Sequence, residues 1–262
     1  MFEIGFIGSG NMAEALLKGM LRHTHNIIMS DPRKDRLEEL NKKYGVSVTD
    51  NNDEVAASSE VVIFAVKPQA AQLLGALNPG TAEPLYISIL AGVATVTLEK
   101  IFGEKKIRLV RAMPNTPAFV MKGITLLCRG SYASGDDIRL AGEIFGYAGS
   151  VITINEGLID AATGVSGCGP AYFYIIMEAL ADAGVRAGLK REDALLLAAH
   201  TASGAAQMVL ETGLHPAALK DMVTSPGGAT IEAVKTLEDK GIRGIMMDAV
   251  DAAVKRTQKL QG

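Results

Sequence analysis

The sequence contains no tryptophan, only two cysteines and few aromatic residues, which make up 5% of the chain. This scarcity of aromatic side chains argues against stacking surfaces for bases or sugars. Cys128 and Cys168 have neither metal-ligand nor redox spacing, which favours a reducing compartment. The four histidines likewise follow no metal-ligand pattern, so we expect no metal site.

Long apolar runs and an excess of positive charge are also missing. The longest apolar stretches, such as "YISILAGVATV", fall short of the roughly 20 residues that span a bilayer. The opening residues, "MFEIGFIGSG", enter a strand pattern without a basic region or a cleavage site, so we expect no signal peptide. The net charge is -3, whereas nucleic acids and anionic membranes attract basic patches. We therefore predict a soluble, cytoplasmic protein that binds neither.

The first part of the 262-residue chain alternates short apolar runs with helical patterns such as residues 11–22 and 33–44. Strands that alternate with helices are typical of a doubly wound, mainly parallel sheet covered on both faces, which is an α/β fold. We expect a dinucleotide-binding domain over residues 1–154, with strands at 3–7, 26–30, 46–48, 61–66, 85–90, 107–112, 124–128 and 151–154.

The second part, residues 155–262, shows no strand pattern and is expected to be entirely helical, with helices at 171–187, 191–211 and 243–260. Residues 194–210, "ALLLAAHTASGAAQMVL", are small or apolar nearly all the way round. A helix without a polar face must be buried on every side. We interpret it as an interface with a second copy of the chain. The alternative is a central position in a bundle of its own chain.

A glycine-rich turn follows the first predicted strand. Residues 8–13 read Gly-Ser-Gly-Asn-Met-Ala and open a helix, which is the G-x-G-x-x-G/A fingerprint in its required strand–turn–helix context. Gly8 permits the tight turn, Gly10 lets a pyrophosphate approach the backbone, and Ala13 allows close packing of the helix on the strand. The sequence therefore predicts a dinucleotide site.

The end of the second strand bears on the choice of cofactor. Asp31 stands where an acid normally holds the ribose hydroxyls of NAD. Ser30, Arg33 and Arg36 are equally placed to receive the 2′-phosphate of NADP, and Asp31 then only caps the helix that Pro32 opens. We favour NADP over NAD, with ordinary solvated arginines as the alternative.

Three further strand ends are expected at the same edge of the sheet: "FAVKPQ" at 64–69, "SILAGV" at 88–93 and "RAMPNTPA" at 111–118. Each is also compatible with an ordinary loop. Lys67 precedes a proline that stops its strand, and the small residues of the second stretch leave room for a flat ring against the backbone. Asn115 and Thr116 lie between the two prolines of the third.

Another glycine pair occurs late in the chain, in "TSPGGATIEAV" at 224–234. Ile231, Val234 and Leu237 have helical spacing, so we expect a helix to begin at about residue 229 or 230. Gly227 and Gly228 directly precede it. The free N–H groups of a helix start favour an anion. A capped loop between two packed helices is the alternative.

Five stretches in this order, "GFIGSGNMAEA", "AVKPQ", "RAMPNTPA", "GVSGCGPAYFY" and "TSPGGATIEAV", make the whole chain resemble the pyrroline-5-carboxylate reductases. The resemblance implies a Rossmann domain followed by a helical dimerisation domain. It also implies homodimers built into larger rings such as a homodecamer, and an active site shared between domains. The implied reaction is reduction of a cyclic imine to proline by NAD(P)H.

The resemblance assigns residues as well. Together with Asp31 and Arg33, the expected cofactor-binding residues are Ile7, Gly8, Ser9, Gly10, Asn11, Met12, Ser30, Asn52, Ala65, Val66, Lys67, Pro68, Ile89, Leu90 and Ala91. The substrate carboxylate is expected at Ser225, Gly227, Gly228, Ala229 and Thr230.

Thr230 is the candidate catalytic residue: it would hydrogen-bond the imine nitrogen and relay a proton from water. The alternative is that Thr230 only caps its helix. Other functions left open are a related imine or β-hydroxyacid dehydrogenase, which needs a catalytic lysine for which Lys190 is poorly placed, and a non-catalytic nucleotide sensor.

Overall fold

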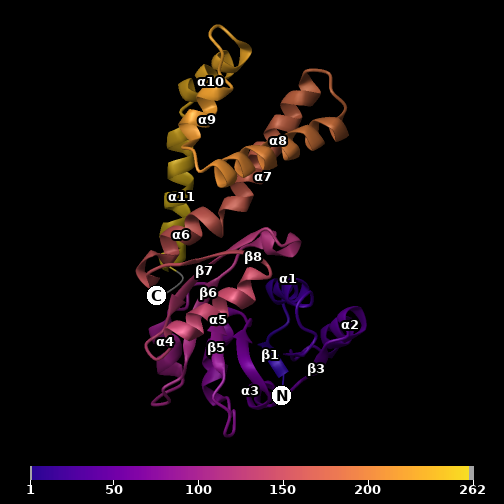
Figure 1. The fold of residues 1–262 in the computed structure, drawn as a ribbon, viewed down its shortest axis with the longest axis vertical. Coiled ribbons are helices and arrows are strands. Elements are labelled where there is room, and N and C mark those ends of the chain that lie inside the picture. The colour runs from indigo at the N-terminus through magenta and orange to yellow at the C-terminus, as the bar shows by residue number, and fades with distance from the viewer. Residues whose placement is uncertain (1, 260–262) are drawn as a thin grey trace. The chain divides into compact units, whose positions relative to one another are not determined.

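The computed structural model describes residues 2–259 and divides the chain into two compact units (Figure 1). Among the described residues, the first unit comprises residues 2–167 and 254–259. The second unit is Cys168–Ala253. The sheet thus lies in the first unit. In the sequence, the second unit is inserted between two segments of the first unit.

Eight strands form one sheet in the order β3-β2-β1-β4-β5-β6-β7-β8. Their bounds are β1 Phe2–Ile7, β2 Ile27–Ser30, β3 Ser47–Thr49, β4 Ser59–Phe64, β5 Leu85–Ser88, β6 Leu109–Met113, β7 Gly123–Arg129 and β8 Gly149–Thr153. All eight predicted strands are confirmed, with ends that shift by a few residues. The order reverses on either side of β1, as in a doubly wound sheet.

One strand pair departs from the parallel arrangement. β6 pairs with β7 antiparallel, whereas β7 and β8 are again parallel to each other. Between β6 and β7 the chain has only a short 3-10 helix, η2 (Thr116–Val120), and no crossover helix. A connection this short returns the chain in the opposite direction, because parallel neighbours need a longer crossover.

Helices cover both faces of the sheet. On one face α1 (Asn11–Met20), α2 (Lys34–Tyr44) and α5 (Gly135–Gly146) share a core with Phe6 and Ile63. On the other face α3 (Asn52–Ser58), η1 (Pro68–Ala76) and α4 (Thr95–Ile101) pack on Ile7 and Phe64. Neighbouring strand residues therefore serve opposite cores, as alternation along a strand requires. η3 (Glu156–Leu158) and α6 (Ile159–Ser166) complete this unit.

The remaining helices are α7 (Gly169–Arg186), α8 (Arg191–Thr212), α9 (Pro216–Met222), α10 (Ala229–Asp239) and α11 (Ile242–Lys259). No strand follows β8 in the described residues, as expected. Within the described part of the chain, no helix combines the length and the apolar character that crossing a bilayer requires.

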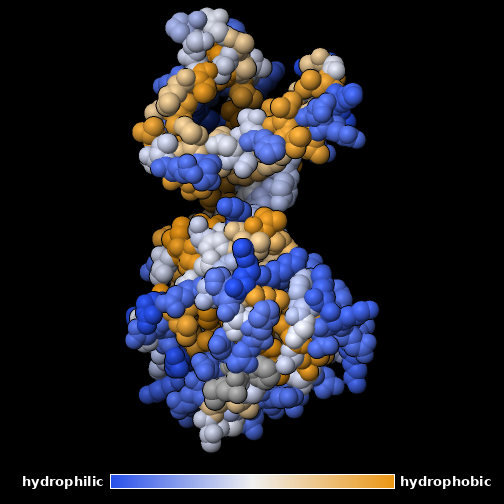
Figure 2. Space-filling model, turned by 45° about the vertical axis from the view of Figure 1, so that its right-hand side comes forward, coloured by the Kyte–Doolittle hydropathy of each residue, from blue (hydrophilic) through white to orange (hydrophobic). Residues whose placement is uncertain are grey.

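The second unit leaves much apolar surface uncovered (Figure 2). On α8, Leu195, Leu196 and Leu197 are 52%, 59% and 56% exposed, and on α7 Phe173 and Ile175 are 56% and 66% exposed. The alternative that α8 is buried centrally in a bundle of its own chain is therefore wrong. Since contiguous apolar surface of this kind is covered in stable proteins, the exposure favours an interface with another molecule.

Candidate functional site

The turn between β1 and α1 requires glycine at its first position. Gly8 has φ +99°, and a Cβ added there would lie 2.7 Å from the Ala65 carbonyl carbon and oxygen. The Gly8 amide donates to the Ser30 carbonyl at 2.8 Å. Gly8 thus joins the ends of β1, β2 and β4 without leaving space for a side chain.

Gly10 is different, because the space in front of it is open. It is the N-cap of α1, has extended backbone angles and makes no side-chain capping bond. A Cβ at Gly10 would have no neighbour within 4 Å. The first amides of α1 therefore face an open site at the positive end of the helix, beside Asn11 and Met12. This geometry suits a phosphate group.

Asp31 lies between this turn and the start of α2. Its carboxylate accepts hydrogen bonds from the amide (3.0 Å) and hydroxyl (2.7 Å) of Ser9, and from the amide, Nε and Nη2 of Arg33 at 2.9–3.2 Å. Burial by itself raises the pKa of Asp31, but the bonds from Arg33 and Ser9 outweigh it and lower the pKa to about 2. Asp31 is ionised and already saturated with donors.

The two arginines near Asp31 have different surroundings. Arg36 donates to the Ser9 carbonyl at 3.0 Å and to Glu14 Oε2 at 2.5 Å, and its side chain is only 12% exposed. Burial raises the pKa of Glu14, but Arg36, Lys43 and Tyr44 together lower it to about 2. Arg36 therefore joins α2 to α1, whereas Arg33 stays 59% exposed.

Ser30 is fully buried at the end of β2. Its hydroxyl lies 2.7 Å from Oδ1 of Asn52 and 3.3 Å from the Phe6 carbonyl. Asn52 begins α3 and is exposed. Ser30 therefore orients Asn52, which is the member of the pair that faces solvent.

The ends of β4 and β5 complete this edge of the sheet. Ala65 and Val66 follow β4, exposed Lys67 is the N-cap of η1, and Pro68 is its first residue. Ile89, Leu90 and Ala91 follow β5, and the Ile89 amide donates to the Phe64 carbonyl at 3.0 Å. A cavity of about 330 Å³ opens between η1 and α4, lined by Pro68, Gln69, Gly92, Val93, Ala94 and Thr97 among others. The residues expected at the cofactor thus lie at the carboxyl ends of strands β1 to β5, in the loops that follow, or in the first turn of the next helix.

Sequence reasoning missed the group that anchors the loop after β5. Glu156, in η3, accepts from the amide of Thr95 at 2.8 Å and from its hydroxyl at 2.5 Å, and so caps α4. Arg111, in β6 and 2% exposed, pairs with the same carboxylate at 3.1 Å. Thr95 lies 61 positions and Arg111 lies 45 positions before Glu156 in the sequence. No local sequence pattern therefore predicts that these three side chains meet.

Asn115, which lies between two prolines in the sequence, makes hydrogen bonds that hold neighbouring segments together. Its Oδ1 accepts from the Ile124 amide and its Nδ2 donates to the Ser166 carbonyl, both at 2.9 Å. It therefore joins the chain after β6 to β7 and α6. Among the described residues, no group of three or more His, Cys, Asp or Glu side chains is arranged to hold a metal ion.

The late glycine pair forms a tight turn in the second unit. The Gly228 amide donates to the Ser225 carbonyl at 3.1 Å, and Gly227 has φ +65°. Proline second and glycine third are the residues that a type II turn favours. A Cβ at Gly228 would lie 2.3 Å from the Ser225 hydroxyl. The turn brings this hydroxyl against the start of the next helix.

α10 begins at Ala229, as predicted, with Gly228 as an N-cap that makes no side-chain bond. Thr230 is exposed in the first turn of this helix. Its hydroxyl has no hydrogen-bond partner among the described residues, so the structure gives Thr230 no capping role. The turn offers unpaired backbone amides, the Ser225 hydroxyl and the Thr230 hydroxyl. This set of donors has the chemistry that suits a small acid, and we refer to it as the late cradle.

Two family profiles match the chain. Residues 156–260 match the profile described as pyrroline-5-carboxylate reductase dimerisation, and residues 3–92 match that of the coenzyme F420-dependent NADP oxidoreductases. The chain is a nucleotide-binding type of oxidoreductase with a dimerisation domain.

Relatives cover nearly the whole length. The pyrroline-5-carboxylate reductase of Synechocystis is 45% identical over 98% of each chain. The structure of such a reductase from Coxiella burnetii is 38% identical, with a TM-score of 0.92 over 100% of this chain and 99% of the other. The Plasmodium falciparum pyrroline carboxylate reductase with NADP bound is 32% identical, with a TM-score of 0.88 over 100% and 98%. With its doubly wound sheet, glycine turn and helical second unit, the chain belongs to the pyrroline-5-carboxylate reductase family.

Proposed function

We propose that this protein reduces 1-pyrroline-5-carboxylate to L-proline with NAD(P)H, and that NADPH is the preferred cofactor. The observation that carries the proposal is family membership at 45% identity over nearly the full length, together with the intact glycine turn and late cradle. An oxidoreductase of this kind completes proline biosynthesis.

The residues at the sheet edge fit a dinucleotide. The open space at Gly10 and the uncapped amides of α1 suit the pyrophosphate. Asn52 and the loops at 65–68 and 89–91 would hold the rest of the cofactor. When bound, the reduced nicotinamide supplies the hydride that goes to the imine carbon.

The preference for NADPH rests on the state of Asp31. A carboxylate that holds NAD must accept bonds from the ribose hydroxyls, whereas Asp31 already accepts five hydrogen bonds from Ser9 and Arg33. Arg33 remains 59% exposed beside it, so its guanidinium is accessible to a 2′-phosphate. The NADP bound to the Plasmodium falciparum relative supports the same choice.

At the other site, the amides that follow Gly227 and the hydroxyl of Ser225 would bind the substrate carboxylate. The ring nitrogen must be protonated by the end of the reaction, and a basic imine arrives readily as the iminium. Thr230 then holds the nitrogen and passes on a proton from water. Its free hydroxyl supports this role over capping. Lys190, the N-cap of α8, is not in a helix interior as a β-hydroxyacid dehydrogenase would require.

The uncovered faces of α7 and α8 support a homodimer, built further into a ring such as a decamer. We propose a dinucleotide domain at 1–154 and a helical dimerisation and substrate domain at 155–262, because the dimerisation profile begins at residue 156. The compact units of the structure divide later, after Gly167. The free cysteines Cys128 and Cys168 support a reducing compartment such as the cytoplasm.

The activity is tested by following NADPH absorbance after addition of pyrroline-5-carboxylate, with proline quantified in the product. We expect one proline per NADPH oxidised and a higher kcat/KM with NADPH than with NADH. Binding of NADPH without turnover would identify a nucleotide sensor instead. Arg33→Ala should lower the preference for NADPH, whereas Lys34→Ala, its exposed neighbour, should not.

Thr230→Ala tests the proton relay. We expect turnover to fall roughly ten- to a hundredfold, the equivalent of about 1–3 kcal/mol, with NADPH binding unchanged. Thr236→Ala is the matched control, because that hydroxyl lies on the same helix and donates to the Glu232 carbonyl at 3.0 Å. Equal turnover in the two variants would remove Thr230 from the mechanism.

A further inference from the structure

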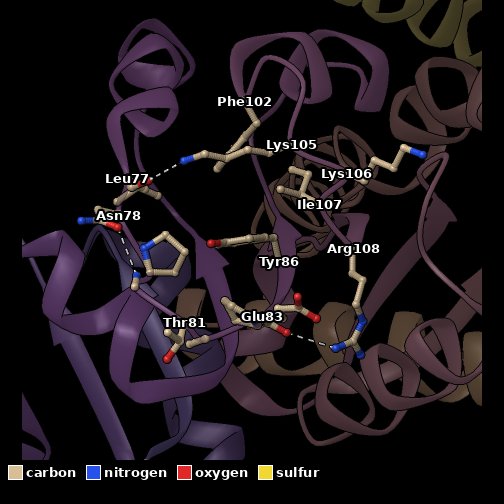
Figure 3. Close-up of a pocket in the computed structure, with 14 residues that line it drawn as sticks. Leu77, Asn78, Thr81, Glu83, Tyr86, Phe102, Lys105, Lys106, Ile107 and Arg108 are labelled. Atoms are coloured by element: carbon tan, nitrogen blue, oxygen red, sulfur yellow. Dashed lines mark hydrogen bonds between the residues drawn. The ribbon is translucent and has the colours of Figure 1, made fainter.

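A second cavity lies at the opposite edge of the same sheet, at the amino ends of β5 and β6 (Figure 3). Its volume is about 610 Å³, and its lining comes from residues 77–84, Tyr86, Phe102 and residues 105–108. The cofactor residues lie at the carboxyl ends of the strands, so this cavity is separate from the proposed dinucleotide site. Its size is that of a typical small-molecule pocket.

Tyr86 points its hydroxyl into this cavity (Figure 3). The residue is 3% exposed, and among the described residues its hydroxyl has no hydrogen-bond partner. Its ring stacks with Phe64 and packs against Phe102. Burial raises the pKa of Tyr86 to about 12, so the hydroxyl keeps its proton and acts as a donor. The hydroxyl is thus a protonated donor that faces the cavity, where it is available to bond an acceptor on a ligand.

The cations around Tyr86 are not equivalent. Arg108 is committed to the wall, because its Nε and Nη2 bond Asp137 and its Nη1 donates to the Glu83 carbonyl at 3.2 Å. Lys105 extends across the cavity, where its only hydrogen bond among the described residues is a long one of 3.4 Å to the Leu77 carbonyl. No described carboxylate pairs with Lys105. Its charge is thus available to a ligand.

The wall opposite Lys105 is ordered by its own bonds. The Gly80 amide donates to Asn78 Oδ1 at 3.2 Å, and the Asn78 amide donates to Asp53 Oδ1 at 2.9 Å. These bonds hold the loop before β5 against the start of α3. The cavity is therefore preformed, which lowers the entropy cost of binding. Arg108 is paired with Asp137 and Lys106 turns toward the Tyr132 ring, so Lys105 is the lining side chain whose positive charge favours an anion in the cavity.

We propose that this cavity is a second ligand site for a small organic anion, with the acid group held by Lys105 and the Tyr86 hydroxyl. The apolar body of the ligand packs on Phe102 and Ile107. The cavity lies at the amino ends of β5 and β6, whereas the proposed dinucleotide site lies at the carboxyl ends of the strands, so a ligand in the cavity would not displace the cofactor.

Tyrosine ring NMR tests the proposal on the full-length protein. The chain has six tyrosines and no tryptophan, so labelling of the tyrosine Cζ atoms gives few signals, and Tyr86→Phe identifies the one from Tyr86. Because that substitution removes only an unpartnered hydroxyl, we expect the variant to fold. The probes are phenyl phosphate, benzoate and their neutral analogue benzyl alcohol.

We expect the Tyr86 signal to shift saturably with phenyl phosphate or benzoate, and the stronger of the two identifies the acid group. Lys105→Gln should weaken binding about tenfold or more, since a charge-assisted bond is lost. Lys100→Gln, which removes an exposed charge outside the cavity lining, should change the binding affinity by less than about twofold.

A Tyr86 signal that does not move with either anion would overturn the proposal. So would equal shifts with benzyl alcohol, or unchanged affinity in Lys105→Gln. No enzyme turnover is measured, so failure here is distinguishable from failure of the proposed reductase activity.

Discussion

Asp31→Asn is the sharpest test of how the cofactor edge is held together. In the native chain this carboxylate bonds both the β1–α1 turn, through Ser9, and the start of α2, through Arg33. An asparagine offers one acceptor oxygen, and its amino group would face the donors of Ser9 or Arg33. The substitution therefore removes the charge and leaves buried donors unpaired.

The size of the effect follows from the pKa of Asp31. The fall from the ordinary 3.8 to about 2 corresponds to about 2 kcal/mol of folding free energy at neutral pH. The side chain is only 7% exposed, so solvent screens this contribution little. Because the folded pKa is the lower one, the stabilisation is fully present above pH 3.8. It is lost as the pH falls through about 2.

The assay is urea unfolding followed by circular dichroism, because the chain has no tryptophan for fluorescence. Protein concentration is held fixed, since assembly couples to stability. We expect the free energy of unfolding of Asp31→Asn to be lower than that of the native chain by about 2 kcal/mol at pH 7 and by only about 1 kcal/mol at pH 3. Glu38→Gln, an exposed site on α2, is the control. A difference that is the same at both pH values would refute the reasoning.

The remaining predictions concern the glycine turn, the loop anchor and assembly. Gly8→Ala should lower the free energy of unfolding by about 2 kcal/mol or more, because Gly8 has a positive φ and lies against the backbone of Ala65. Gly10→Ala should leave the melting temperature unchanged but weaken NADPH binding in a fluorescence titration. Glu156→Gln should lower stability by about 3 kcal/mol in denaturant unfolding, because a buried arginine loses its partner; an unchanged midpoint would contradict this. Leu196→Asp should dissociate the oligomer in sedimentation, whereas Leu73→Asp, at 71% exposure in the first unit, should not.

The strands and the helix starts were predictable because their causes are local. Apolar runs between turn residues located all eight strands, and the spacing of Ile231, Val234 and Leu237 located the start of α10 at Ala229. The direction of β7 was not predicted, because it depends on the shortness of the connection through η2 and not on the strand's own residues.

Long-range electrostatics were equally invisible. Arg33 and Arg36 are equivalent in the sequence, as two exposed cations at a helix start. Their difference arises because Glu14, 22 residues before Arg36, pairs with Arg36 and not with Arg33. The Glu156 anchor and the Tyr86 cavity likewise depend on residues that only the folded sheet brings together.

The return of the chain at Val254 has a consequence for biosynthesis. Residues 254–259 group with the sheet, although residues 168–253 do not. During translation all eight strands are made before the second unit begins, and the last turns of α11, which group with the sheet, follow that unit. Because no described residue of α11 is buried, a truncation before Val254 removes neither a strand nor a core side chain and should leave the sheet itself resistant to proteases.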